Sequence, residues 1–155
     1  MFRRYHIIRN KSLPYLQDIF LLAIRVHWGW GFFQAGLGKF THFDRSVNYF
    51  ESLGLPLPYL QVVMAGGVEL LGGLLLMVGL GTSWVSVPLL FTMAVAFFLA
   101  HYEALRALML YPKIKPFLKA EPFLYMFSTM IVFLFGPGGI SFDALRSRYS
   151  KSGTR

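Results

Sequence analysis

Four long apolar stretches with few charges alternate with polar segments along the chain. They cover about residues 15–40, 58–80, 84–104 and 117–136. A helix needs about 20 predominantly apolar residues to cross the hydrocarbon core of a bilayer, and each stretch is close to that length. The pattern therefore predicts an all-α, polytopic membrane protein, a transmembrane four-helix bundle.

The segments between these stretches predict how the spans are connected. Residues 41–57 place apolar side chains near helical spacing before Gly54 and Pro56 break the pattern, which indicates a short interfacial helix between spans one and two. The turn at residues 81–83 is too short to reach anything but an antiparallel neighbour. We expect one domain over residues 1–147 and a flexible basic tail over residues 148–155.

Composition and charge agree with a lipid environment. Of the 155 residues, 55% are hydrophobic and 14% charged, and mean hydropathy is +0.53, too apolar for a small soluble domain. The net charge of +8 comes largely from the two ends of the chain rather than from a basic stripe, which argues against nucleic-acid binding. Basic flanks at both ends predict cytoplasmic N- and C-termini. Cysteine is absent, so the chain offers no thiolate ligand and no disulfide.

Glu69 is the main candidate for chemistry. It lies about eleven residues into the second span, or roughly 16 Å at 1.5 Å per residue, where a carboxylate is costly and is usually functional. Small residues one turn away make its helix face a shallow groove: Ala65, Gly66, Gly72 and Gly73. We expect Glu69 to be catalytic, and Gly66 and Gly73 to contact a ligand.

Arg25, about ten residues into the first span, is the expected partner of Glu69. A guanidinium can bind a carboxylate through two hydrogen bonds. Two interpretations stay open. The pair could be a structural lock within the bundle, or a proton or substrate site in which Arg25 is also catalytic.

An aromatic pocket beside a buried acid would suit a quinone, whose ring stacks on aromatic side chains and whose carbonyls accept hydrogen bonds. We expect further ligand contacts from Gly29, Phe33 and Lys39 in the first span and from His101 at the end of the third. A metal would need His101 together with His42 or His27, because positions 101 and 103 of one helix face different directions. We expect no metal site and no covalently bound cofactor.

Taken together, several motifs resemble the DoxX family of small bacterial membrane proteins. They are Arg25 with Gly29, Phe33, Gly36 and Lys39, the LGLP of residues 53–56, Gly66-Gly67-x-Glu69 with Gly72, Gly73 and Gly79, and the GPGG-x-SFD of residues 136–143. The resemblance implies a bacterial inner-membrane, four-helix protein associated with redox biology, since relatives include a subunit of a thiosulfate:quinone oxidoreductase.

The leading hypothesis is a redox-linked membrane subunit that binds a quinone or hydroquinone beside the Glu69–Arg25 pair. Whether the chain is itself an enzyme, as part of a quinone-linked oxidoreductase, is left open. The alternative is a non-catalytic scaffold or assembly factor that docks a partner protein through the glycine-rich face and the basic ends. A homodimer fits either hypothesis, whereas a transporter is disfavoured because four helices leave a narrow path.

Overall fold

The computed structural model describes residues 2–110 and 114–152, and within these residues it contains helices and no strands. The helices are α1 (Phe2–Thr41), α2 (Phe43–Ser52), α3 (Pro58–Val78), α4 (Thr82–Ala100), α5 (Tyr102–Leu110), α6 (Ile114–Lys119), α7 (Glu121–Phe135) and α8 (Phe142–Ser152). The four long apolar elements are α1, α3, α4 and α7, and the expected interfacial helix is α2. The all-α fold is confirmed.

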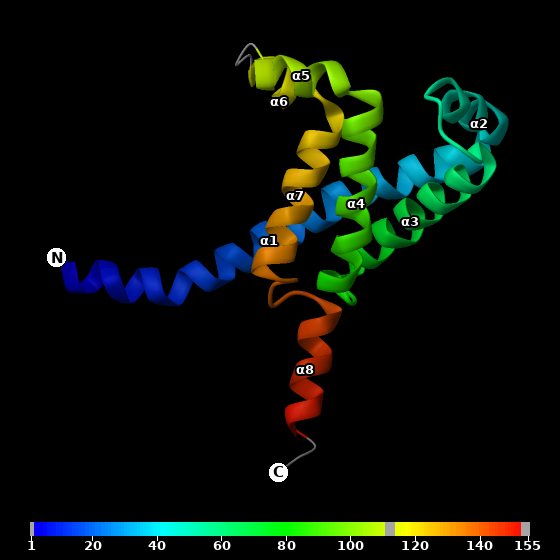
Figure 1. The fold of residues 1–155 in the computed structure, drawn as a ribbon. Coiled ribbons are helices and arrows are strands. Elements are labelled where there is room, and N and C mark those ends of the chain that lie inside the picture. Colours follow the sequence, from blue (N-terminus) through cyan, green and yellow to red (C-terminus); the bar gives the residue numbers. More distant parts are fainter. Residues whose placement is uncertain (1, 111–113, 153–155) are drawn as a thin grey trace.

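The four long helices form two pairs (Figure 1). Helix α1 packs along α3, and α4 packs along α7, with fewer contacts between the pairs. The pairs meet where α8 leaves the bundle, here called the α8 end, and diverge toward the opposite end, which carries α2 and α5 and is here called the α2 end.

Glycines allow α1 and α3 to pack backbone against backbone. A Cβ built on Gly73 would lie 2.6 Å from the carbonyl oxygen of Gly29, and a Cβ built on Gly36 would overlap the backbone nitrogen of Leu70. Such close approach is how helices associate where lipid offers no hydrophobic drive. The contacts also fix an antiparallel register in which Arg25 lies opposite Gly79 and Gly36 lies opposite Gly66.

Between the pairs, toward the α8 end, lies a small packed core. Its fully or nearly fully buried members are Phe32, Leu76, Leu89, Met93 and Val132. Every long helix contributes to it, so it joins the two pairs where they are closest.

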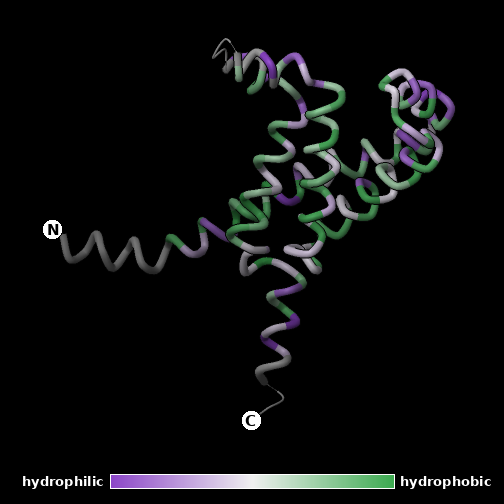
Figure 2. Tube along the Cα trace, in the orientation of Figure 1, coloured by the Kyte–Doolittle hydropathy of each residue, from purple (hydrophilic) through white to green (hydrophobic). Residues whose placement is uncertain are grey.

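Hydrophobic residues follow the long helices, while hydrophilic residues gather on α2 and α8 (Figure 2). Helices α3 and α4 are each long and apolar enough to cross a membrane alone, whereas α7 is apolar but has 15 residues. Many large apolar side chains face outward, including Trp84, Phe91 and Leu134, which are 87%, 71% and 68% exposed. Lipid contact explains such a surface, and the chain is an all-α membrane protein.

The boundaries differ from expectation mainly at α1. The first span was expected over residues 15–40, but α1 runs unbroken from Phe2 through Pro14 to Thr41. The second and fourth expected spans agree with α3 and α7 to within four residues at each end. The third expected span is divided by a break at His101, so that most of it forms α4 and its last residues begin α5. Helix α8 reaches Ser152, and residues 153–155 lie outside the described residues, so the flexible tail stays a prediction.

The loop after α7 ties the α8 end together. Asp18 accepts a hydrogen bond from the backbone of Gly139 at 2.5 Å, and Arg25 donates one to the carbonyl of Ile140, also at 2.5 Å. Asp143 accepts from the backbone nitrogens of Gly81 and Thr82 at 2.9 and 3.1 Å, and from the Thr82 hydroxyl at 3.1 Å. We call these contacts of Asp18, Arg25 and Asp143 the clasp. They join α1, the α3–α4 turn and the start of α8.

Asp143 caps the N-terminus of α4, where unpaired backbone N–H groups favour an anion. Burial alone raises the pKa of Asp143, but the hydrogen bonds from Gly81 and Thr82 and the nearby charge of Arg146 outweigh it, so the pKa lies below its ordinary value. A lowered folded-state pKa stabilises the fold above the unfolded-state pKa, and this contribution is lost as the pH falls through the folded-state value.

We therefore expect Asp143→Asn to lower the free energy of unfolding by about 0.5–1 kcal/mol at pH 7, because asparagine can still cap the helix but removes the negative charge that the N-terminus of α4 favours. The difference between wild type and Asp143→Asn should shrink as the pH falls below about 4, the ordinary pKa of an aspartate, because the carboxyl of the unfolded wild-type chain then takes up a proton before that of the folded chain. Paired thermal melts at pH 7 and pH 3 measure it. An equal difference at both values would contradict the role given to the carboxylate.

Candidate functional site: an ion pair beside a cavity

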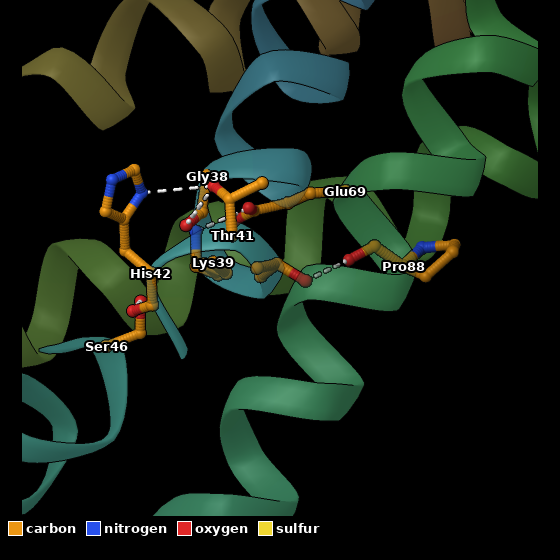
Figure 3. A network of polar contacts seen from close by, with 8 residues as sticks. Gly38, Lys39, Thr41, His42, Ser46, Glu69 and Pro88 are labelled. Carbon is orange, nitrogen blue, oxygen red and sulfur yellow. Dashed lines mark hydrogen bonds and ion pairs between the residues drawn. The ribbon is translucent and has the colours of Figure 1, made fainter. Parts of the chain in front are cut away.

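A buried ion pair joins the two helices of the first pair. Lys39 Nζ of α1 donates a hydrogen bond to Glu69 Oε2 of α3 at 2.5 Å (Figure 3). The Glu69 side chain is 4% exposed and the Lys39 side chain 21%. A charged pair this deep in an apolar bundle loses most of its hydration, and the attraction between partners must compensate for that loss.

Helix geometry explains how the two side chains meet. Side chains lean toward the N-terminus of their own helix. Because α1 and α3 are antiparallel, Lys39 leans toward the α8 end while Glu69 leans toward the α2 end. A Cβ built on Gly66 would lie 3.4 Å from Lys39 Cβ, so Lys39 starts one turn from Glu69 and reaches back to it. Lys39 also occupies the last turn of α1, where the helix dipole favours a cation.

The expected Glu69–Arg25 pair is wrong. Arg25 is fully buried but lies at the α8 end, where it bonds to the carbonyl of Ile140 and sits against Gly79. The antiparallel register separates residue 25 from the position opposite Glu69 by about ten residues, or roughly 15 Å along the helix. Arg25 therefore belongs to the clasp, and Lys39 is the base that pairs with Glu69.

Beside the pair, a cavity of about 880 Å³ lies between the two diverging helix pairs. Its walls come from α1, α2, α3, α4 and α7. Lys39 and Glu69 contribute the deep polar groups, Phe32 and Met93 of the packed core form its floor, and apolar side chains such as Met64 and Leu99 line much of the rest. The size matches that of pockets for medium-sized organic ligands.

The mouth of the cavity, at the α2 end, carries most of its other polar groups. They are His42 at the α1–α2 junction, Arg45 and Ser46 of α2, Gln61 of α3, His101 directly after α4, and Glu121 of α7. His42 lies at the α1–α2 junction, where its Nδ1 is 3.0 Å from the Thr41 hydroxyl (Figure 3). The sequence singled out Lys39 and His101 as ligand contacts and His42 as a possible partner of His101, and the structure brings these three to the same cavity.

The remaining expected ligand contacts lie elsewhere. Gly29 and Gly73 pack against each other, and Gly66 packs against Phe40. Phe33 stacks on Trp30, with ring centroids 5.5 Å apart. These four residues form or flank the α1–α3 interface and do not line the cavity. Their contact with a ligand stays a prediction that the helix packing does not favour.

Sequence reasoning missed Arg45, Thr92, Glu121 and Tyr125, which all line the cavity. A signal existed for Thr92, since its hydroxyl is a polar group deep in an apolar span; it donates to the carbonyl of Pro88 at 2.9 Å. Glu121 and Tyr125 were hidden because nothing in the sequence showed which face of α7 turns inward. Among the described residues, no group of three or more His, Asp or Glu side chains is arranged to hold a metal ion.

Comparison with known proteins agrees with this class of fold. The DoxX family model matches residues 20–102, more than half of the chain, a range that includes α3, α4 and both members of the ion pair. A protein of Bacillus subtilis (strain 168) named "Putative oxidoreductase CatD" is 40% identical over 78 residues, which cover 50% of this chain and 54% of that protein. The chain thus matches about half the length of this relative. No solved structure gives a significant match.

Fold and ion pair define a helical membrane protein with a charged pair at an internal cavity. The chain belongs to the DoxX family.

Proposed function

We propose that the protein is a redox-linked membrane protein that binds a quinone or hydroquinone in this cavity. The observation that carries the proposal is the position of the Lys39–Glu69 pair, because it sets an acid and a base in the wall of an otherwise largely apolar space. The aromatic ring would lie against Phe32 and Tyr125, and an oxygen of the ligand would accept a hydrogen bond from Lys39. The relative's name, which describes an oxidoreductase, supports a redox role.

In this role Glu69 exchanges the protons of the ligand. Oxidation of a hydroquinone breaks two O–H bonds and releases two protons and two electrons. The Glu69 carboxylate accepts one proton, passes it to water, and then accepts the other. Lys39 stabilises the negative charge that develops on the ligand oxygen. The electrons pass to a partner protein that carries a redox cofactor.

Mass spectrometry of lipophilic molecules extracted from gently purified protein tests the proposal. We expect nearly one quinone per chain in the wild type and a loss of about tenfold or more in Glu69→Gln and in Lys39→Gln, since each removes a charged, desolvated contact worth more than 1.4 kcal/mol.

Glu51→Gln is the matched control. It makes the same carboxylate-to-amide change on an exposed part of α2 that does not line the cavity, and quinone content should not change. No enrichment over bulk lipid in the wild type would reject the quinone site and leave the scaffold alternative. A scaffold would have to use a surface other than the glycines on the Glu69 face, because Gly66, Gly72 and Gly73 already pack against Phe40, Leu89 and Gly29.

A further inference from the structure

The two ends of the cavity differ in a way that bears on proton transfer. Along α3 the lining residues run from Gln61 to Glu69, so the ion pair lies at the deep end and the α2 end lies at the mouth. The mouth residues come from several elements and include ionisable side chains of both signs: His42, Arg45, His101 and Glu121. Ionisable side chains within membrane spans usually face other protein groups or a water-filled space. The ionisable side chains at this mouth could each form hydrogen bonds with water molecules that enter the cavity.

Beyond the ion pair, toward the α8 end, the structure is closed. On α4 the cavity lining ends at Pro88. Phe32 and Met93 line the cavity and also belong to the packed core, and behind them Leu76, Leu89 and Val132 have no exposed surface. The clasp then seals the α8 end, where Arg25, Thr82 and Ser86 are fully buried. A charged or hydrated species would have to lose its water to cross these layers, which is costly.

We infer that the cavity is a one-sided aqueous vestibule, which connects the Lys39–Glu69 pair to water at the α2 face of the membrane and not at the α8 face. The inference builds on the proposed function by adding direction: protons exchanged at Glu69 enter or leave at the α2 face. The groups that face the pair along this route are the mouth residues, Tyr125 of α7 and the Thr92 hydroxyl of α4. A ligand with a long apolar tail can still enter sideways, because Met64 and Phe91 are 62% and 71% exposed.

The cysteine-free sequence allows a direct test with single cysteines. A membrane-impermeant, positively charged methanethiosulfonate reacts with thiols that are in contact with water. It would be applied to right-side-out and to inverted membrane vesicles that contain one variant at a time. Thr92→Cys reports on the deep cavity, and Ser86→Cys reports on the closed side of the same helix six residues away.

Three further variants provide controls. Ser52→Cys on α2 and Ser147→Cys on α8 are exposed and define which face each vesicle presents, while Val87→Cys is 52% exposed outside the cavity lining and represents lipid. Labelling of each variant after denaturation confirms that its thiol is intact.

We expect Thr92→Cys to be labelled from the same face as Ser52→Cys, at a rate within about tenfold of it, and to stay unlabelled from the face that Ser147→Cys reports. Ser86→Cys and Val87→Cys should stay unlabelled from both faces. Labelling of Thr92→Cys from neither face would show a dry cavity, and labelling from both would show that the clasp end is open; either result overturns the vestibule.

The test separates this inference from the proposed function. A short-tailed quinone added in excess should slow labelling of Thr92→Cys if both are correct. One-sided labelling that the quinone leaves unchanged would keep the vestibule and reject the quinone site. If the extraction experiment finds bound quinone but Thr92→Cys is not labelled, the quinone site is kept and the vestibule is rejected.

Discussion

Replacing Lys39 by methionine is expected to lower the free energy of unfolding by about 2 to 3 kcal/mol, because it leaves the Glu69 carboxylate in an apolar bundle without its partner. Removing one member of a buried ion pair usually costs about 3–5 kcal/mol, and partial exposure of Lys39 places this pair below that range. Denaturant titration of the protein in detergent, followed by circular dichroism, measures the loss.

The double replacement Lys39→Met with Glu69→Met distinguishes an ion pair from simple packing. Two apolar side chains of similar volume require no paired charge, so most of the lost stability should return. Arg106→Met is the control for the loss of a basic residue, since Arg106 is exposed and its contact with Glu103 is long, at 4.0 Å; it should change stability by less than about 0.5 kcal/mol. A double variant that is less stable than both single variants would show that Lys39 and Glu69 contribute independently.

Gly36→Ala is expected to destabilise the bundle by about 3 kcal/mol or to prevent folding. The added methyl group would overlap the backbone of Leu70, and a backbone within a helix cannot move aside as a flexible side chain can. The α1–α3 contact would have to separate, and the Lys39–Glu69 bond with it. Thermal melts and the yield of monodisperse protein would report the effect.

Gly38→Ala is the matched control, two residues away on the same helix. A Cβ at Gly38 would meet nothing within 4 Å, and alanine forms helices better than glycine, so this variant should be neutral or more stable by up to about 1 kcal/mol. Equal destabilisation by the two substitutions would mean that α1 tolerates no side chain on either face, contrary to the packing described here.

Much of the fold follows from the sequence because the bilayer sets the length of a span. The apolar stretches were predictable on that basis, while the short turn at residues 81–83 and the helical spacing in residues 41–57 predicted the α3–α4 hairpin and the short helix α2. The length of α1 was not, because the helix continues through Pro14 into the polar N-terminal flank, where the sequence would normally be expected to end it. Counting residues from the expected start of the first span, at residue 15, therefore placed Arg25 at the same depth in the membrane as Glu69.

The correct register was present in the sequence in another form. Gly29 and Gly36 are seven residues apart on α1, as are Gly66 and Gly73 on α3, and antiparallel pairing of these glycines brings Lys39 within two turns of Glu69, close enough for its long side chain to reach the carboxylate. The mouth of the cavity could not be predicted in this way. It depends on the angle between the two helix pairs, which arises from the packed core and the clasp rather than from periodicity within one helix.

The divergence of the helix pairs gives the bundle a profile that widens from the α8 end to the α2 end. A bilayer crossed by the bundle would meet a wider section at the α2 end than at the α8 end, where the clasp holds the helices together. Lateral pressure from lipids around the wider section acts to push the pairs toward each other. We therefore expect lipids that favour curvature to alter the width of the space beside Glu69.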